Sequence, residues 1–136
     1  MKVMITARAR FSAAHRLLNP AWDDARNVAV FGSCYNLHGH GHDYTLEVTV
    51  AGDVDPGTGM ILNVKELKRV VDEKVIARVD HKNLNFDVPF LEGQNPTAET
   101  LALAFWKILE PEIPAGRLHE IRVLETENNV ATVRRD

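Results

Sequence analysis

Residues 2 to 15 alternate between apolar and polar positions, which predicts a β-strand with one buried face. The apolar positions of one parity are Val3, Ile5, Ala7, Ala9, Phe11 and Ala13. The intervening positions carry Lys2, Thr6, Arg8, Arg10 and Ser12. His15 continues the apolar parity, so we expect its imidazole on the buried side of this strand.

A second alternating segment, from about Asp43 to Val50, predicts another strand. Its inward positions are Tyr44, Leu46, Val48 and Val50, and its outward positions are Thr45, Glu47 and Thr49. The intervening segment, "LLNPAWDDARNVAVFGS" (17–33), is rich in turn-forming residues, and we expect a loop there. "GDVDPGTG" after the second strand predicts a turn.

The middle of the chain changes to a helical period. Residues 63 to about 79 place Val64, Leu67, Val71 and Val75 on one stripe, and Asn63 can cap this helix. A loop is expected over "DHKNLNFDVPFLEGQ" (80–94), followed by a helix from "NPT" (95–97) to about Glu110. Two short strands, about 118–126 and 130–134, are joined by a turn at "ENN".

The predicted order is therefore ββααββ, an α+β fold with an antiparallel four-stranded sheet and two helices on one face. The length of 136 residues fits one domain, 1–136. A four-stranded sheet has two open edges, and self-association is a simple way to cover them.

Composition narrows the functional classes. The chain is 45% hydrophobic and 26% charged, as expected for a soluble globular protein, and no segment reaches the roughly 18 apolar residues of a membrane span. The net charge of −3 argues against nucleic acid as a partner. The single cysteine and the absence of an apolar stretch before the first arginines fit a cytoplasmic protein.

The segment "CYNLHGHGHDY" (34–44) carries the chemistry of the chain. His38, His40 and His42 occupy alternate positions, and in an extended chain such side chains point the same way, ~7 Å apart. His40 and His42 share the inward parity of Tyr44, where an imidazole without a partner would be costly. Together with His15 they could form a three-histidine Zn²⁺ site with an open fourth position. Spacing alone is equally compatible with histidines in a surface loop.

Five further residues invite a structural or a chemical interpretation. Cys34 is either a small buried hydrophobe or, near a metal, a base or nucleophile. Asp80 and His81 are either the solvated end of a helix or an acid–base pair. Glu125 shares the inward parity of its strand, so its carboxylate requires a partner, such as a ligand with adjacent N–H donors. Glu99 complements the dipole of the second helix in the simplest interpretation.

Taken together, these motifs resemble the 6-pyruvoyl-tetrahydropterin synthase family, which includes the bacterial 6-carboxy-tetrahydropterin synthases of queuosine biosynthesis. The resemblance covers almost the whole chain, through "FSAAHRL", "C-x5-HGHDY", "GDVDPGTGMILNVKELK", "VDHKNLN", "NPTAETLA" and "VLETENN". It implies the tunnelling fold, a β2α2β2 unit whose trimers close into a barrel and stack as hexamers. Active sites in such an oligomer lie between subunits.

The resemblance also assigns roles. It implies His15, His40 and His42 as Zn²⁺ ligands, Cys34 as the base, and Asp80 with His81 as a proton relay. Glu125 would anchor the pterin, with Thr97 and Glu99 nearby. The substrate implied is 7,8-dihydroneopterin triphosphate, with Arg16 and Mg²⁺ as candidates for meeting the triphosphate charge.

Two features leave the exact reaction open. Cys34 and His40 show the C-x5-HGH spacing of the pyruvoyl type, and "ETENN" also resembles that type, whereas "NPTAE" resembles the bacterial carboxy type. Cys34 and His38 also form C-x3-HGH, although "DY" and the distance to "GDVDP" favour His40 and His42. We expect 6-pyruvoyl-tetrahydropterin as the product, with the carboxy reaction as the alternative and a catalytically inactive pterin-binding protein as the third possibility.

Overall fold

A computed structural model describes all residues, 1–136. Two long strands, β1 (Val3–His15) and β2 (His40–Gly52), pair antiparallel over their whole length, from Val3 opposite Gly52 to His15 opposite His40. β4 (Arg117–Thr126) pairs with β2, and β5 (Asn129–Arg134) pairs with β4. The predicted strands are confirmed, each within about three residues of its expected ends.

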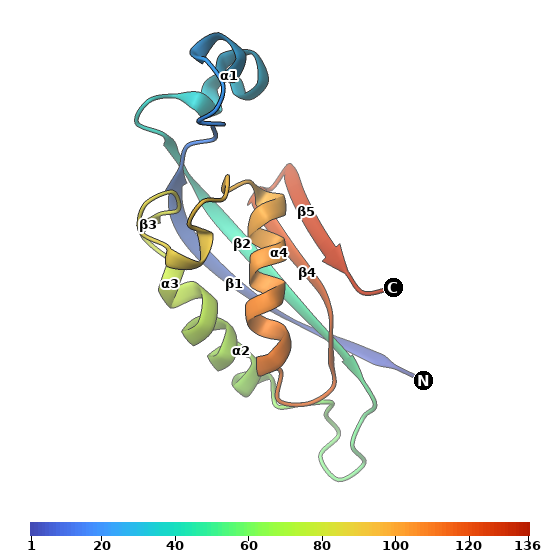
Figure 1. The fold of residues 1–136 in the computed structure, drawn as a ribbon. Helices are drawn as coiled ribbons and strands as arrows, with labels where there is room; N and C mark the ends of the chain where they lie inside the picture. Colours follow the sequence, from blue (N-terminus) through green and yellow to red (C-terminus); the bar gives the residue numbers. More distant parts are fainter.

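Two helices pack against one face of this sheet (Figure 1). They are α2 (Val64–Val71) and α4 (Ala98–Leu109). The inward residues of β1 and β2, among them Phe11, Tyr44 and Leu46, are buried against Leu67, Leu101 and Phe105 of these helices. The α+β prediction, with the helices on one face, is confirmed.

The sheet has five strands, so the four-stranded prediction was short by one. β3 (Lys82–Asn83) pairs parallel with Ala13 and Ala14 of β1, giving the order β3-β1-β2-β4-β5. β3 covers only the end of the β1 edge, because its partner residues are 13 and 14 alone. The outer edge of the N-terminal part of β1 and the outer edge of β5 therefore have no strand beside them.

The first expected helix is not regular. After α2 the chain forms a π-helical turn at Asp72–Ile76 and a short helix α3 (Ala77–Val79), before the extended Asp80. Asn63 caps α2 as predicted, since its side chain accepts a hydrogen bond from the Lys65 N–H. α4 begins after Thr97, whose hydroxyl accepts from the Thr100 N–H, so Pro96 lies outside the helix.

The segment between β1 and β2, residues 16–39, is not the plain loop that was predicted for residues 17–33. It contains helix α1 (Asp24–Phe31), capped by Asp23, and a 3₁₀ turn at Gly32–Tyr35. This excursion extends beyond the end of the sheet (Figure 1). Because β1 and β2 stay paired up to His15 and His40, the excursion leaves and rejoins the sheet at two predicted metal ligands.

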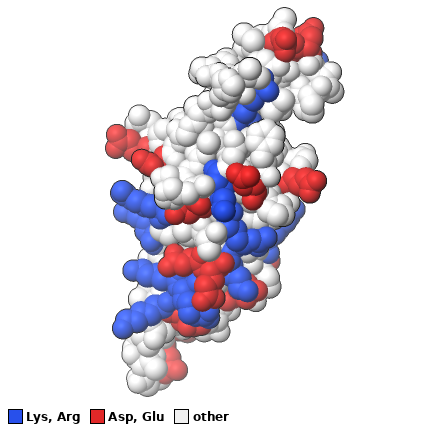
Figure 2. Space-filling view, turned by 90° about the vertical axis from the view of Figure 1, so that its left-hand side faces the viewer, with Lys and Arg blue, Asp and Glu red and all other residues white.

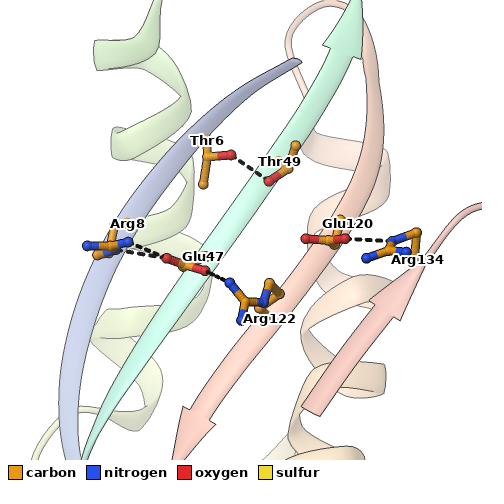
Figure 3. Close-up of polar contacts among 7 residues, drawn as sticks. All are labelled: Thr6, Arg8, Glu47, Thr49, Glu120, Arg122 and Arg134. Atoms are coloured by element: carbon orange, nitrogen blue, oxygen red, sulfur yellow. Dashed lines mark hydrogen bonds and ion pairs between the residues drawn. The ribbon is translucent and has the colours of Figure 1, made fainter. Parts of the chain in front are cut away.

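The other face of the sheet carries a ladder of charged and hydroxyl side chains (Figure 3). Glu47 accepts hydrogen bonds from Arg8 on β1, at 2.9 and 2.5 Å, and from Arg122 on β4, at 2.8 Å. Glu47 is only 7% exposed, although its parity predicted an outward side chain. The outward direction is right, but the two arginines cover the carboxylate and satisfy both of its oxygens.

Acidic and basic side chains are mixed over the main body of the molecule (Figure 2). Further pairs on the sheet face are Glu120 with Arg134 at 2.6 Å and Thr6 with Thr49 at 2.7 Å (Figure 3). The face drawn in Figure 2 has no large surface of one sign. No helix is long and apolar enough to cross a bilayer.

Candidate active site

Four side chains converge at the end of the β1–β2 ribbon: His15, His40, His42 and Glu125. One ligand atom from each lies within 4.8 Å of all the others. His15 and His40 face each other across the ribbon, and His42 is two residues further along β2. Alternation puts all three imidazoles on the helix-covered face, as predicted, and Glu125 reaches them from the end of β4.

The ligand atoms of the cluster lie close enough together to bind one ion between them. The Nε2 atoms of His15 and His40 are 3.3 Å apart, and Nε2 of His42 lies 2.8 Å from Oε1 of Glu125. Despite that short distance, the buried His42 Nε2 has no partner in hydrogen-bonding geometry. A buried nitrogen without a partner is costly unless something else occupies its lone pair. These residues therefore fit a metal ion, and imidazole nitrogens with a carboxylate suit Zn²⁺.

The tautomer of His15 is fixed by the start of α4. Its Nδ1–H donates to the carbonyl of Pro96 at 2.8 Å, which leaves Nε2 free to point into the cluster. Burial is the main cause that lowers the pKa of both His15 and His42, against the opposing effect of the Glu125 carboxylate. Lowered pKa values keep these imidazoles neutral, the form that binds a metal ion. The sequence did not identify the Pro96 carbonyl as the partner of His15, although the position of Pro96 directly before the Thr97 cap can be seen in the sequence.

Gly39 allows the ribbon to close at the cluster. Its φ is +73°, and a Cβ there would come within 2.6 Å of the His15 carbonyl oxygen, so a side chain is excluded. The backbone of Gly39 thus lies against the His15 carbonyl. At Gly41 a Cβ would meet its nearest neighbour, the Ala13 carbonyl oxygen, at 3.5 Å, so glycine is not required there.

His38 stands apart from the cluster. It is exposed, in the turn that precedes β2, whereas His40 is the first residue of the strand. The alternative register, with His38 as a ligand, therefore has no support in the geometry.

Tyr44 lies under the cluster. Its buried hydroxyl is 3.4 Å from Nδ1 of His15, and burial raises the pKa of this phenol, with smaller contributions from Glu125 and Cys34. The phenol therefore stays protonated and closes the apolar side of the site.

Cys34 lies in the 3₁₀ turn of the excursion and is partly buried. It is not a member of the cluster of His15, His40, His42 and Glu125, which we call the metal-ligand cluster. Its carbonyl accepts a hydrogen bond from the Leu17 N–H at 2.8 Å, which ties this turn to the chain just beyond His15.

Asp80 and His81 form a pair at the β1 edge of the sheet. Nδ1 of His81 is 3.0 Å from Oδ2 of Asp80, whose other oxygen accepts from the Ser12 N–H at 2.9 Å. That N–H lowers the pKa of Asp80, and His81 assists. His81 has the left-handed φ of 59°, and its side chain is exposed.

Within one chain, Asp80 and His81 are not members of the metal-ligand cluster. His81 lines a shallow pocket with Ser12, Ala14 and Asp43, which have outward parity, and with the cluster residue His42. The imidazoles of His15 and His40 project to the opposite, helix-covered face. The acid–base role of Asp80 and His81 stays a prediction.

The predicted pterin-binding residues are partly together. Glu125 and Glu99 line one pocket with Asn128 and Asn129, next to the cluster. Thr97 uses its hydroxyl to cap α4. Arg16 does not face this pocket; its guanidinium contacts Tyr35.

The family model for 6-pyruvoyl tetrahydropterin synthase matches residues 4–136. The chain belongs to this family. It is 40% identical to the human 6-pyruvoyl tetrahydrobiopterin synthase over 129 residues, covering 95% of this chain and 89% of that protein. The fruit-fly protein of the same name, from Drosophila melanogaster, is 43% identical, with 96% and 78% covered.

A solved structure of the Caenorhabditis elegans 6-pyruvoyl tetrahydropterin synthase has the same fold. Its TM-score is 0.93 at 34% identity, with 100% of this chain and 97% of that chain covered. This similarity confirms the predicted tunnelling fold. As a member of the 6-pyruvoyl tetrahydropterin synthase family, the protein is an enzyme of the lyase type.

Proposed function

We propose that this protein is a zinc-dependent lyase that converts 7,8-dihydroneopterin triphosphate to 6-pyruvoyl-tetrahydropterin and triphosphate. The observation that carries the proposal is the cluster of three Nε2 atoms, with one of them buried and unpaired, beside the Glu125–Glu99 pocket. The chain belongs to the 6-pyruvoyl tetrahydropterin synthase family, and its three imidazoles and the Glu125 carboxylate supply the metal ligands and the pterin anchor of the proposed reaction.

In this proposal His15, His40 and His42 hold the zinc ion. The ion would supply Lewis-acid catalysis, which acidifies a C–H bond of the substrate side chain. The Pro96 carbonyl orients His15, and Tyr44 excludes water from beneath the site. The remaining task of the protein side chains is to transfer protons to and from the substrate.

Cys34 is the proposed base. A thiolate is a competent proton acceptor near neutral pH, and the 3₁₀ turn that carries Cys34 is hydrogen-bonded to Leu17, two residues after His15. The proton removed from the side chain is balanced by one delivered to the ring, so no external oxidant or reductant is required. Elimination of triphosphate then gives the pyruvoyl side chain.

Asp80 and His81 are the proposed proton relay, and they would act in the site of a neighbouring copy. Their position at the β1 edge of the sheet, with an exposed imidazole, supports this arrangement. The lowered pKa of Asp80 keeps its carboxylate ionised beside His81. The open edges of β1 and β5 are where copies would join into a barrel.

A trimer or hexamer is therefore the expected assembly. Sedimentation at micromolar protein should give a particle of at least three times the 15.2 kDa chain mass. A monomer with full turnover would contradict both the barrel and the shared site.

Replacing Glu125 with glutamine should weaken pterin binding by about 1–3 kcal/mol, because one acceptor becomes a donor opposite the N–H groups of the ring. Zinc content should stay the same, since three imidazoles remain. Metal analysis and pterin titration measure the two effects separately. Loss of zinc would instead make Glu125 a fourth ligand, and unchanged affinity would leave it a structural role only.

The choice of product follows from the Cys34-to-His40 spacing. The C-x5-HGH segment resembles the pyruvoyl type, and catalysis is sensitive to the position of a base at about the 1 Å scale. Zinc-loaded protein should be incubated with 7,8-dihydroneopterin triphosphate and the products identified by mass. We expect 6-pyruvoyl-tetrahydropterin. Mainly 6-carboxy-tetrahydropterin with acetaldehyde would establish the alternative, and no turnover would favour a binding protein.

A further inference from the structure

Arg16 directly follows the cluster residue His15, and its main chain is held firmly. Its N–H donates to Oδ1 of Asn85 at 2.8 Å, and its carbonyl accepts from Nδ2 of the same side chain at 2.8 Å. Both polar groups of the Arg16 main chain are thus satisfied by one amide. The base of the Arg16 side chain is therefore fixed relative to His15.

The Arg16 side chain turns toward the segment that carries Cys34. Its Nε–H donates to the Tyr35 carbonyl at 3.0 Å, and its guanidinium carbon lies 4.2 Å from the centre of the Tyr35 ring. A guanidinium over an aromatic face is a favourable cation–π contact. Together with the Leu17–Cys34 hydrogen bond, this contact means that the residues after His15 hold the main chain at both Cys34 and Tyr35.

Tyr35 is in turn hydrogen-bonded to helix α1. Its hydroxyl donates to Oδ1 of Asp24 at 2.5 Å, in the first turn of that helix. Arg16, Tyr35 and Asp24 therefore form a chain from the metal-ligand strand to the helix of the excursion. Other side chains of the excursion do not take part: Arg26, for example, lies over Trp22, at 3.9 Å from the ring centre.

We propose that the Arg16–Tyr35 contact is a positioning device that sets the distance and direction of the Cys34 thiol relative to the metal-ligand cluster. The proposal rests on the proposed role of Cys34 as the base. It gives Arg16 a different task from binding triphosphate, because its guanidinium is engaged by Tyr35. Since small misplacements of a catalytic group can cost about 10²-fold in rate, loosening this contact should slow the proton removal.

The test compares four variants of the zinc-loaded protein. Arg16→Met removes both parts of the contact, whereas Tyr35→Ala removes the ring and leaves the main-chain carbonyl that accepts from Arg16. Tyr35→Phe keeps the ring under the guanidinium but loses the bond to Asp24. Arg26→Met is the matched control, since it removes another stacked arginine of the same excursion. Each is measured for zinc content, thermal unfolding, kcat, KM and the rate of iodoacetamide reaction. Because the chain has one cysteine, that rate reports Cys34 alone.

We expect Arg16→Met and Tyr35→Ala to keep zinc, to lose about 10- to 10²-fold in kcat with little change in KM, and to alkylate several times faster than the wild type. Tyr35→Phe should lie closer to the wild type than Tyr35→Ala, and Arg26→Met should match the wild type. Wild-type kcat and alkylation in both contact-breaking variants would overturn the proposal. So would equal changes in Arg26→Met, which would indicate general loosening, or a raised KM with unchanged kcat, which would return Arg16 to triphosphate binding.

Failure of the underlying role can be told apart from failure of the contact. Full turnover in Cys34→Ala would remove Cys34 as the base. The alkylation rates would still report whether Arg16 and Tyr35 hold the thiol. Tyr35→Ala keeps the experiment decisive if Arg16→Met does not fold, since Tyr35 is only partly buried and does not belong to the hydrophobic core.

Discussion

Cys34→Ala should retain zinc and the fold but lose about 10²- to 10⁴-fold in turnover, the usual contribution of a positioned acid or base. The thiol is outside the metal-ligand cluster and outside the hydrophobic core, so alanine removes neither a ligand nor core packing. Turnover of 7,8-dihydroneopterin triphosphate, metal analysis and thermal unfolding are the measurements.

Two matched variants sharpen this result. Cys34→Ser keeps the size of the side chain but not its acidity, so it should be as slow as Cys34→Ala. Ser33→Ala changes the preceding residue of the same 3₁₀ turn, which is exposed, and should leave turnover unchanged. Turnover of Cys34→Ala near that of the wild type would exclude the thiol as the base.

His40→Ala should lose most of its zinc and nearly all activity, whereas His38→Ala should keep both. His40 supplies one of the three Nε2 atoms at the centre of the cluster, and two imidazoles with a carboxylate leave a poorer site. His38 is exposed in the turn before β2 and is not a member of the cluster. Zinc per chain after dialysis, measured by atomic absorption, checks both variants. Loss of zinc with His38→Ala and retention with His40→Ala would show that the ligand register is displaced by two residues.

The cluster was largely predictable from alternation. Parity alone assigned His15, His40 and His42 to the buried face, because side chains in a strand alternate strictly. The sequence could not show that His15 and His40 are direct cross-strand partners, since register depends on the whole β1–β2 pairing. The Pro96 carbonyl, 81 positions along the chain from His15, was equally invisible.

The parts of the fold that were missed depend on long-range contacts or on weak local signals. β3 has two residues and exists only because β1 offers an edge at Ala13 and Ala14. α1 is short, and the turn formers around it obscured its period, although Asp23 was a readable cap. The burial of Glu47 required knowledge that Arg8 and Arg122 lie on the neighbouring strands.

The separation of the metal ligands from the thiol has a consequence for how this scaffold can change. The imidazoles stand on a ribbon whose two strands are paired along their whole length, whereas Cys34 is on the excursion 16–39, held by surface contacts. Insertions or deletions inside the excursion can therefore move the base while the metal ligands keep their register. An excursion transplanted from a relative with a different thiol-to-histidine spacing would thus be a compact unit for redesigning the reaction, with metal content as the check that the ribbon is undisturbed.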